Sequence, residues 1–271
     1  MGKISKALER HKKEKVIEVK RLPIEGREDL TKKRPESPLN SEWMIQNSFS
    51  PKVVVLSAPD SLDAENFKIL RAQILFPKDG KRPRIIMVTS AFPGEGKTFV
   101  AVNLAVSLAL GINEHVLLLD CDLRRPEVHH VLGYSNTEGL YEFLTGKRQL
   151  PDLLIRTKIE KLSFLAAGSP STSPSEWLSS TMMREFLEEV RARYDDRFII
   201  IDSPPSQVTS EANVLANYVD GIIFVVMAQR SPKEAIRRNI ENLGKKMLGI
   251  VFNGYATDER SYHKYDKYYR R

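Results

Sequence analysis

The chain has 271 residues, 41% of them hydrophobic, which is enough for one large α/β domain or two small ones. Its single cysteine, Cys121, excludes an internal disulfide and suits a reducing cytoplasm. No apolar run approaches the roughly 18 residues needed to span a bilayer, and the start "MGKISKALERHKKEK" lacks the apolar stretch of a secretory signal.

The net charge of +7 is concentrated at the N-terminus. Residues 1–35 hold twelve Lys/Arg and six Asp/Glu, a charge of +6, and the rest of the chain is therefore close to neutral at +1. A uniformly basic surface would indicate nucleic acid, so we expect no nucleic-acid partner. A basic arm on a neutral body is either a solvated tail or a segment that meets anionic lipid or an acidic partner.

The elements divide the chain into three parts. Residues 1–50 form a basic arm, with a short helix expected at 3–18, and a polar, proline-containing linker that we expect to be mobile. Residues 51–254 hold the globular domain, and residues 255–271 form a tyrosine-rich tail.

Helices and apolar strands alternate within the domain. Helices are predicted at 61–76, with Asp60 or Ser61 as the cap, at 98–111, 139–147 and 175–194, and strands at 84–90, 115–122, 162–168, 198–205, 221–228 and 248–254. Several strands are continuously apolar, as expected when helices cover both faces of a sheet. The predicted fold class is α/β, in three layers, with a mostly parallel sheet flanked by helices.

The first strand runs into "SAFPGEGKT", which from Ala91 reads as a Walker A loop with Ala at its first Gly. Glycines in such a loop keep backbone N–H groups accessible to phosphate oxygens, the lysine carries a cation to them, and the following hydroxyl can bind Mg²⁺. This predicts a P-loop NTPase fold that binds ATP and Mg²⁺. The predicted nucleotide-binding residues are Pro93, Gly94, Glu95, Gly96, Lys97, Thr98 and Phe99.

Carboxylates end two of the predicted strands. Asp202 follows an apolar run in the Walker B pattern, which holds Mg²⁺ directly or through water. Asp120 and Asp122 stand two apart in the predicted strand 115–122, so we expect their carboxylates on one face, with a cation or a proton between them.

In this order, "SAFPGEGKT", "LLLDCDLRRP" and "FIIIDSPP" resemble the Walker A, A′ and B motifs of the bacterial tyrosine kinases that accompany capsular and extracellular polysaccharide production. The resemblance covers about residues 55–271 and is to the stand-alone cytoplasmic type. It implies Lys97, Asp120, Asp122 and Asp202 as catalytic residues and Thr98, Asp122 and Asp202 as Mg²⁺ contacts. Within this set, Asp120 would accept the tyrosine proton.

The resemblance also assigns a role to the tyrosine-rich tail. By its composition alone it could equally dock its rings on a neighbour. The resemblance makes Tyr262, Tyr265, Tyr268 and Tyr269 phosphate acceptors. It also implies a homo-oligomeric ring, a separate transmembrane activator, a tyrosine phosphatase, and recruitment to the inner face of the membrane.

The resemblance extends to three further groups of residues. Glu65, Lys68 and Arg71 match an E-x-x-R-x-x-R stripe of ring contacts, except that Lys68 replaces an arginine; an exposed Glu–Lys pair is the alternative. Related P-loop ATPases place an asparagine at Asn253 against adenine, although Asn-Gly is also an ordinary turn. Arg124 and Arg125 either neutralise phosphate, meet a neighbour or form structural salt bridges.

Two rival functions stay open at this level. Partition and septum-site ATPases share the general fold, but they carry a lysine early in the loop, where this chain has Phe92. The second rival is a nucleotide-binding scaffold of the polysaccharide export machinery that turns over little ATP.

Overall fold

The computed structural model describes residues 49–135, 138–193 and 197–255. The predictions for the basic arm and for the four tyrosines at 262–269 lie outside these residues. Among the described residues, none of the helices combines the length and apolar character needed to cross a bilayer.

A seven-stranded sheet runs through the described part of the chain in the order β3-β4-β2-β5-β1-β6-β7. Every pair of neighbouring strands is parallel except the short β3, which runs antiparallel to β4. The strands are β1 Ile85–Ser90, β2 His115–Asp120, β3 Ile155–Arg156, β4 Leu162–Leu165, β5 Arg197–Asp202, β6 Gly221–Met227 and β7 Met247–Asn253. The predicted mostly parallel sheet is confirmed.

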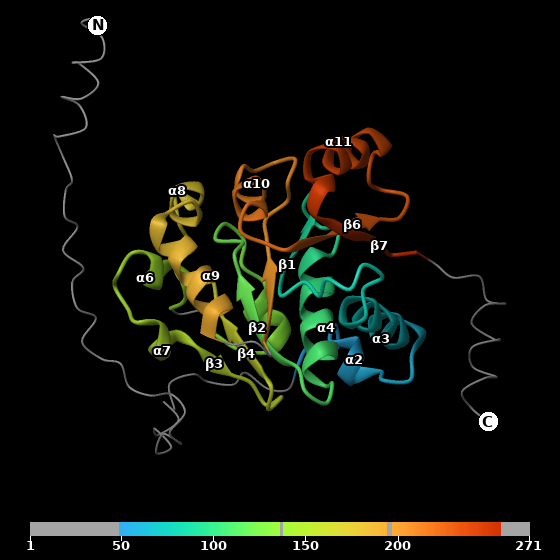
Figure 1. Ribbon diagram of the computed structural model, residues 1–271, viewed down its shortest axis with the longest axis horizontal. Helices are drawn as coiled ribbons and strands as arrows, with labels where there is room; N and C mark the ends of the chain where they lie inside the picture. Colours follow the sequence, from blue (N-terminus) through green and yellow to red (C-terminus); the bar gives the residue numbers. More distant parts are fainter. Residues whose placement is uncertain (1–48, 136–137, 194–196, 256–271) are drawn as a thin grey trace, which may run out of the picture. The chain divides into compact units, whose positions relative to one another are not determined.

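Helices cover both faces of this sheet (Figure 1). Alternate residues of β1 enter different cores: Ile86 and Val88 pack with helices α2–α5, whereas Ile85 and Met87 pack with helices α6–α11. The helices are α2 Val54–Ser57, α3 Leu62–Leu75, α4 Lys97–Ala109, α5 Val128–Leu132, α6 Leu140–Leu144, α7 Leu150–Leu153, α8 Pro174–Leu178, α9 Thr181–Arg193, α10 Glu211–Ala216 and α11 Lys233–Leu243, and a 3₁₀ turn follows at Gly244–Lys246. The three-layer prediction is confirmed.

Local capping explains where two of the helices begin. Ser61 caps α3, as predicted, because its Oγ accepts a hydrogen bond from the N–H of Ala64 at 3.1 Å. The single helix predicted at 175–194 was wrong, since the structure has α8 and α9 with a break between them. At the break, Ser180 Oγ accepts from the N–H of Met183, which starts a new helix.

β7 differs from the central strands because it lies at the edge of the sheet. It pairs with β6 on one side and with no described strand on the other. Leu248, Ile250 and Phe252 are between 36% and 64% exposed, whereas the apolar residues of β1 and β5 are buried. An apolar strand at an edge keeps free backbone groups and part of its side-chain surface in contact with solvent.

Candidate active site

The loop between β1 and α4 has the geometry of a phosphate cradle. Gly94 and Gly96 adopt φ of 81° and 93°, the left-handed region that L side chains avoid. At Gly96 a Cβ would also lie 1.9 Å from Asn253 Nδ2, so any side chain there would displace the Asn253 side chain. Lys97 begins α4, and the loop therefore ends at a helix N-terminus, where backbone N–H groups can bind an anion.

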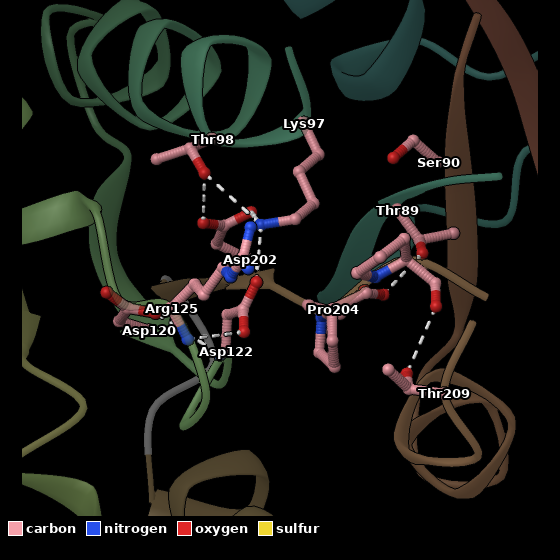
Figure 2. Close-up of polar contacts among 12 residues, drawn as sticks. Thr89, Ser90, Lys97, Thr98, Asp120, Asp122, Arg125, Asp202, Pro204 and Thr209 are labelled. Carbon is pink, nitrogen blue, oxygen red and sulfur yellow. Dashed lines mark hydrogen bonds and ion pairs between the residues drawn. The ribbon is translucent and has the colours of Figure 1, made fainter. Parts of the chain in front are cut away.

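Lys97 and Thr98 leave the first turn of α4 and meet the acidic residues (Figure 2). Lys97 Nζ lies 2.8 Å from Asp122 Oδ2 and 3.8 Å from Asp202 Oδ1, and Thr98 Oγ1 donates to Asp202 Oδ2 at 2.7 Å. Burial disfavours the charged ammonium, but attraction to Asp202 and Asp122 outweighs it and raises the pKa of Lys97 above its ordinary value. The lysine is thus a fixed cation, held by carboxylates in this structure.

Asp202 has the environment expected of a Mg²⁺ contact. It is fully buried at the end of β5, and its Oδ1 has no hydrogen-bond partner within the described part of the chain. Burial raises its pKa to about 6, although Lys97 and the Thr98 hydroxyl work in the opposite direction. One hydroxyl and one or two carboxylates suit Mg²⁺, which takes its other ligands from water and phosphates. The described residues hold no cluster of three or more His, Cys, Asp or Glu side chains arranged around a metal.

Asp120 and Asp122 differ more than the sequence indicated. The strand ends at Asp120, so the predicted placement of both carboxylates on one strand was wrong. The chain turns because Asp120 Oδ1 accepts from the N–H of Asp122 at 3.2 Å and Oδ2 from the N–H of Val128 at 3.1 Å. Burial, and then repulsion from Asp202, raises the pKa of Asp120 well above its usual range. Asp122 lies in the following loop, against Lys97.

A second set of contacts fixes the loop from the side of β6 and β7, and little in the sequence indicates it. Glu95 is buried; its Oε2 accepts from the N–H of Phe92 at 2.9 Å, and Ser231 Oγ donates to its Oε1. Asn253 Nδ2 donates to the carbonyl of Glu95 at 3.0 Å. Asn253, predicted to meet adenine, contacts the phosphate loop in this structure. No local pattern identifies Ser231, because it lies 136 residues beyond Glu95.

The two arginines after Asp122 have different surroundings. Arg124 forms an ion pair with Glu211 of α10 through both Nε and Nη2, each at 2.9 Å, and Glu211 is buried. Of the three readings of Arg124, the structural salt bridge is therefore the one found. Arg125 has an exposed side chain, and its backbone N–H donates to Asp122 Oδ1 at 3.0 Å.

The predicted ring-contact stripe lies along α3. Lys68 Nζ pairs with Glu65 at 3.1 Å, and Arg71 donates to the carbonyl of Ser107 on α4 at 2.7 Å. All three side chains are partly exposed. Their contacts within one chain are the exposed Glu–Lys pair expected as the alternative, together with a link between two helices.

Comparisons with known proteins agree with this geometry. Residues 83–247 match the AAA domain family. The tyrosine-protein kinase YwqD of Bacillus subtilis is 34% identical over 216 residues, which cover 79% of this chain and 90% of that protein. The solved structure of the chimerical protein CapA2B2 superposes with a TM-score of 0.71 at 30% identity, over 80% of this chain and 96% of the other.

A more distant solved structure shares the fold. The septum site-determining protein MinD of Pyrococcus horikoshii, solved in complex with Mg-ADP, gives a TM-score of 0.54 at 27% identity. The match covers 65% of this chain and 72% of that chain.

Proposed function

Because this chain belongs to the bacterial tyrosine-protein kinases, we propose that it is an ATP-dependent autokinase that phosphorylates tyrosines in its own C-terminal tail. The observation that carries the proposal is the convergence of Lys97, Thr98, Asp122 and Asp202 beside a loop with two left-handed glycines. Such a site has the cation, the hydroxyl and the carboxylates that phosphoryl transfer requires.

Bound Mg²⁺·ATP would supply the phosphoryl group and part of the charge that neutralises it. Thr98 and Asp202 would hold the metal, together with Asp122. Lys97 would exchange its contact with Asp122 for the phosphate oxygens, because a phosphate group carries more negative charge than one carboxylate. Positioning and charge neutralisation would supply most of the rate, since the transition state demands little covalent chemistry from the protein.

The proton of the attacking tyrosine needs an acceptor, for which we retain Asp120. Its raised pKa makes its carboxylate a stronger base than an ordinary aspartate. Both of its oxygens, however, accept backbone hydrogen bonds. Asp122 lies in the loop that follows β2, against Lys97. The pH–rate profiles of Asp120→Asn and Asp122→Asn separate the two roles, because the variant that lacks the proton acceptor should lose the acidic limb, where the rate falls as the carboxylate becomes protonated.

The tail tyrosines at 262, 265, 268 and 269 are the proposed acceptors, and a neighbouring copy in a ring is the proposed donor. Glu65, Lys68 and Arg71 are the proposed ring contacts; their partial exposure on α3 leaves them accessible. A separate transmembrane chain would activate the enzyme and recruit it to the inner face of the membrane, and a tyrosine phosphatase would reverse the reaction. Through this cycle the kinase would regulate polysaccharide polymerisation and export.

The two rival functions have less support. Phe92, 36% exposed, stands where the septum-site group has its additional lysine. A scaffold with little turnover would bind ATP and leave the tail unmodified, which the following experiment measures directly.

The test is incubation of the full chain with MgATP and the activator's cytoplasmic segment, followed by mass mapping of phosphotyrosine. Lys97→Met should reduce transfer by more than about 100-fold, because one lost charge-stabilising donor already costs about 10²–10³ in rate. Mixed with wild type, the Lys97→Met chain should acquire phosphate at residues 262–269, since its tail can enter a neighbour's site.

Lys233→Gln is the matched control, because it also removes one cation but lies at an exposed position of α11, outside the proposed site and ring contacts; it should retain transfer to the tail. A well-folded wild-type chain that binds MgATP and leaves all four tyrosines unmodified would rule out the kinase and favour the scaffold.

A further inference from the structure

An open cavity lies at the end of the sheet opposite to the active site. It has a volume of about 910 Å³ and is lined by the starts of β1 and β7, by α9 and by the segments that precede β1, β6 and β7. The phosphate loop follows the other end of β1. Because β1 has six residues, about 3.3 Å apart, the two sites are separated by roughly 20 Å.

Part of the charge that lines the cavity is neutralised within the fold. Arg191 pairs with Asp220 at 2.7 Å, and Arg82 pairs with Glu114 at 3.2 Å. Lys246 donates to the carbonyls at the end of α10. These three cations are therefore engaged in holding the structure together.

The remaining cations are available to a ligand. Lys81, Arg184 and Lys245 also line the cavity, and their side chains form no ion pair or hydrogen bond with any other residue that the structure describes. The acidic residues beside them are Asp79, whose Oδ1 accepts from the backbone of Lys81, and Glu188. Three unpaired cations around one hollow attract an anion, and an arginine among them can hold a phosphate through two parallel hydrogen bonds.

We propose that this basic cavity binds the phosphotyrosines of the chain's own tail after phosphorylation. The inference rests on the proposed function, and charge is its first argument. Residues 256–271 hold five Lys/Arg and three Asp/Glu, so the unmodified tail carries +2 and is repelled. Four phosphates of about −1.5 to −2 each change that charge to about −4 to −6.

Reach is the second argument. The tail starts where β7 ends, and β7 begins at the cavity, since Met247 and Leu248 line it. Seven residues of β7 span about 23 Å. Tyr262 is the eighth residue after Gly254, and eight extended residues reach about 26–29 Å. The tail can therefore return to the cavity along the free edge of β7, where Leu248, Ile250 and Phe252 offer partly exposed apolar surface for tyrosine rings.

Binding at this site would hold the tail, once phosphorylated, away from the active sites of the ring. An unphosphorylated tail is free to enter a neighbour's active site, whereas a phosphorylated tail is held at the opposite end of its own chain. Binding of the tail to its own chain would thus reduce how often it enters a neighbour's active site, until a phosphatase removes the phosphates.

A synthetic peptide tests the site without relying on the chain's own activity. The probe is residues 261–271 with phosphotyrosine at 262, 265, 268 and 269, titrated into full-length chain in which these tyrosines are phenylalanine. Saturating MgADP is present to occupy the phosphate loop. We expect saturable binding, at least tenfold weaker for the unphosphorylated peptide.

Charge reversal locates the site. Arg184→Glu with Lys245→Glu should weaken the phosphopeptide at least tenfold. Lys233→Glu with Arg238→Glu makes the same change in net charge on exposed positions of α11 outside the cavity, and should change binding less than twofold. If both double variants lost the same affinity, the effect would come from net charge alone and the proposal would be overturned. It would also be overturned if the peptide bound without MgADP but not with it. If the peptide binds while the wild-type chain fails to phosphorylate its tail, the proposed function fails and the cavity remains a phosphotyrosine site.

Discussion

The two ends of the central strands hold charge in opposite ways. At the carboxyl ends, Lys97 and Asp202 are buried, and backbone N–H groups of the loop after β2 donate to both oxygens of Asp120. At the amino ends, Arg184 and Lys245 line an open cavity and form no ion pair with the described residues. A reaction needs atoms placed to within about half an ångström, whereas capture of a flexible anionic segment needs mainly charge and space. The first end should therefore be sensitive to geometry and the second to charge.

Two glycines test this difference with the same substitution, and here we expect the largest effect. Gly96 and Gly80 both have positive φ, but an added Cβ meets Asn253 at Gly96 and nothing within 4 Å at Gly80, beside the cavity. Gly96→Ala should weaken ATP binding about 100-fold, since left-handed strain of about 1–2 kcal/mol adds to a lost hydrogen bond of about 1 kcal/mol. Titration with a fluorescent nucleotide measures this.

Gly80→Ala should lower the unfolding free energy by about 1–2 kcal/mol and leave ATP affinity unchanged. If the two substitutions weakened nucleotide binding equally, the contact with Asn253 would not be the cause of the loss at Gly96. Backbone strain, which both positions share, would then explain both effects.

Acidity should weaken the active site by about tenfold. The pKa of Asp202 is raised to about 6, so the carboxylate is ionised at pH 7 and largely protonated at pH 5. One unit below its pKa only about a tenth of the group can bind Mg²⁺, and MgADP affinity should fall accordingly. Calorimetric titration at both pH values checks this, with Asp202→Asn as the variant that should lose the pH-dependent part.

The stability of the nucleotide-free chain should respond to Asp202 with the opposite sign. A carboxyl group whose folded pKa is raised binds more protons in the folded state, so its contribution to stability is full below about pH 4 and is lost as the pH rises through 6.

If the affinity for MgADP did not change between pH 7 and pH 5, Asp202 would not be the Mg²⁺ contact.

The smallest effect concerns the contact between Glu95 and Ser231. Glu95→Ala and Ser231→Ala should each weaken ATP binding at least about fivefold, because each removes a hydrogen bond worth about 1 kcal/mol. The double variant should be little worse than either single one, as expected for partners in one interaction. Ser175→Ala, which removes an exposed serine–serine contact, is the control and should leave affinity unchanged. Fully additive losses would mean that the two side chains act independently.

The sequence by itself determined the fold class and most of the residues of the candidate site. The geometry of a P-loop can be predicted from its motif, because Gly94, Gly96, Lys97 and Thr98 are close together in the chain. Continuously apolar runs predict strands that are buried on both faces, and Asp202 ends one of these strands. These features depend on local order and on strand periodicity, which survive in a linear sequence.

Only the tertiary structure decided which distant residues meet. Asp122 left the strand because backbone hydrogen bonds to Asp120 turned the chain, and Arg124 became a structural ion pair because α10 brought Glu211 beside it. The basic cavity likewise combines Lys81, Arg184 and Lys245 from separate segments. The reason is physical: such contacts form only after packing has closed long loops, and no spacing within the sequence records them.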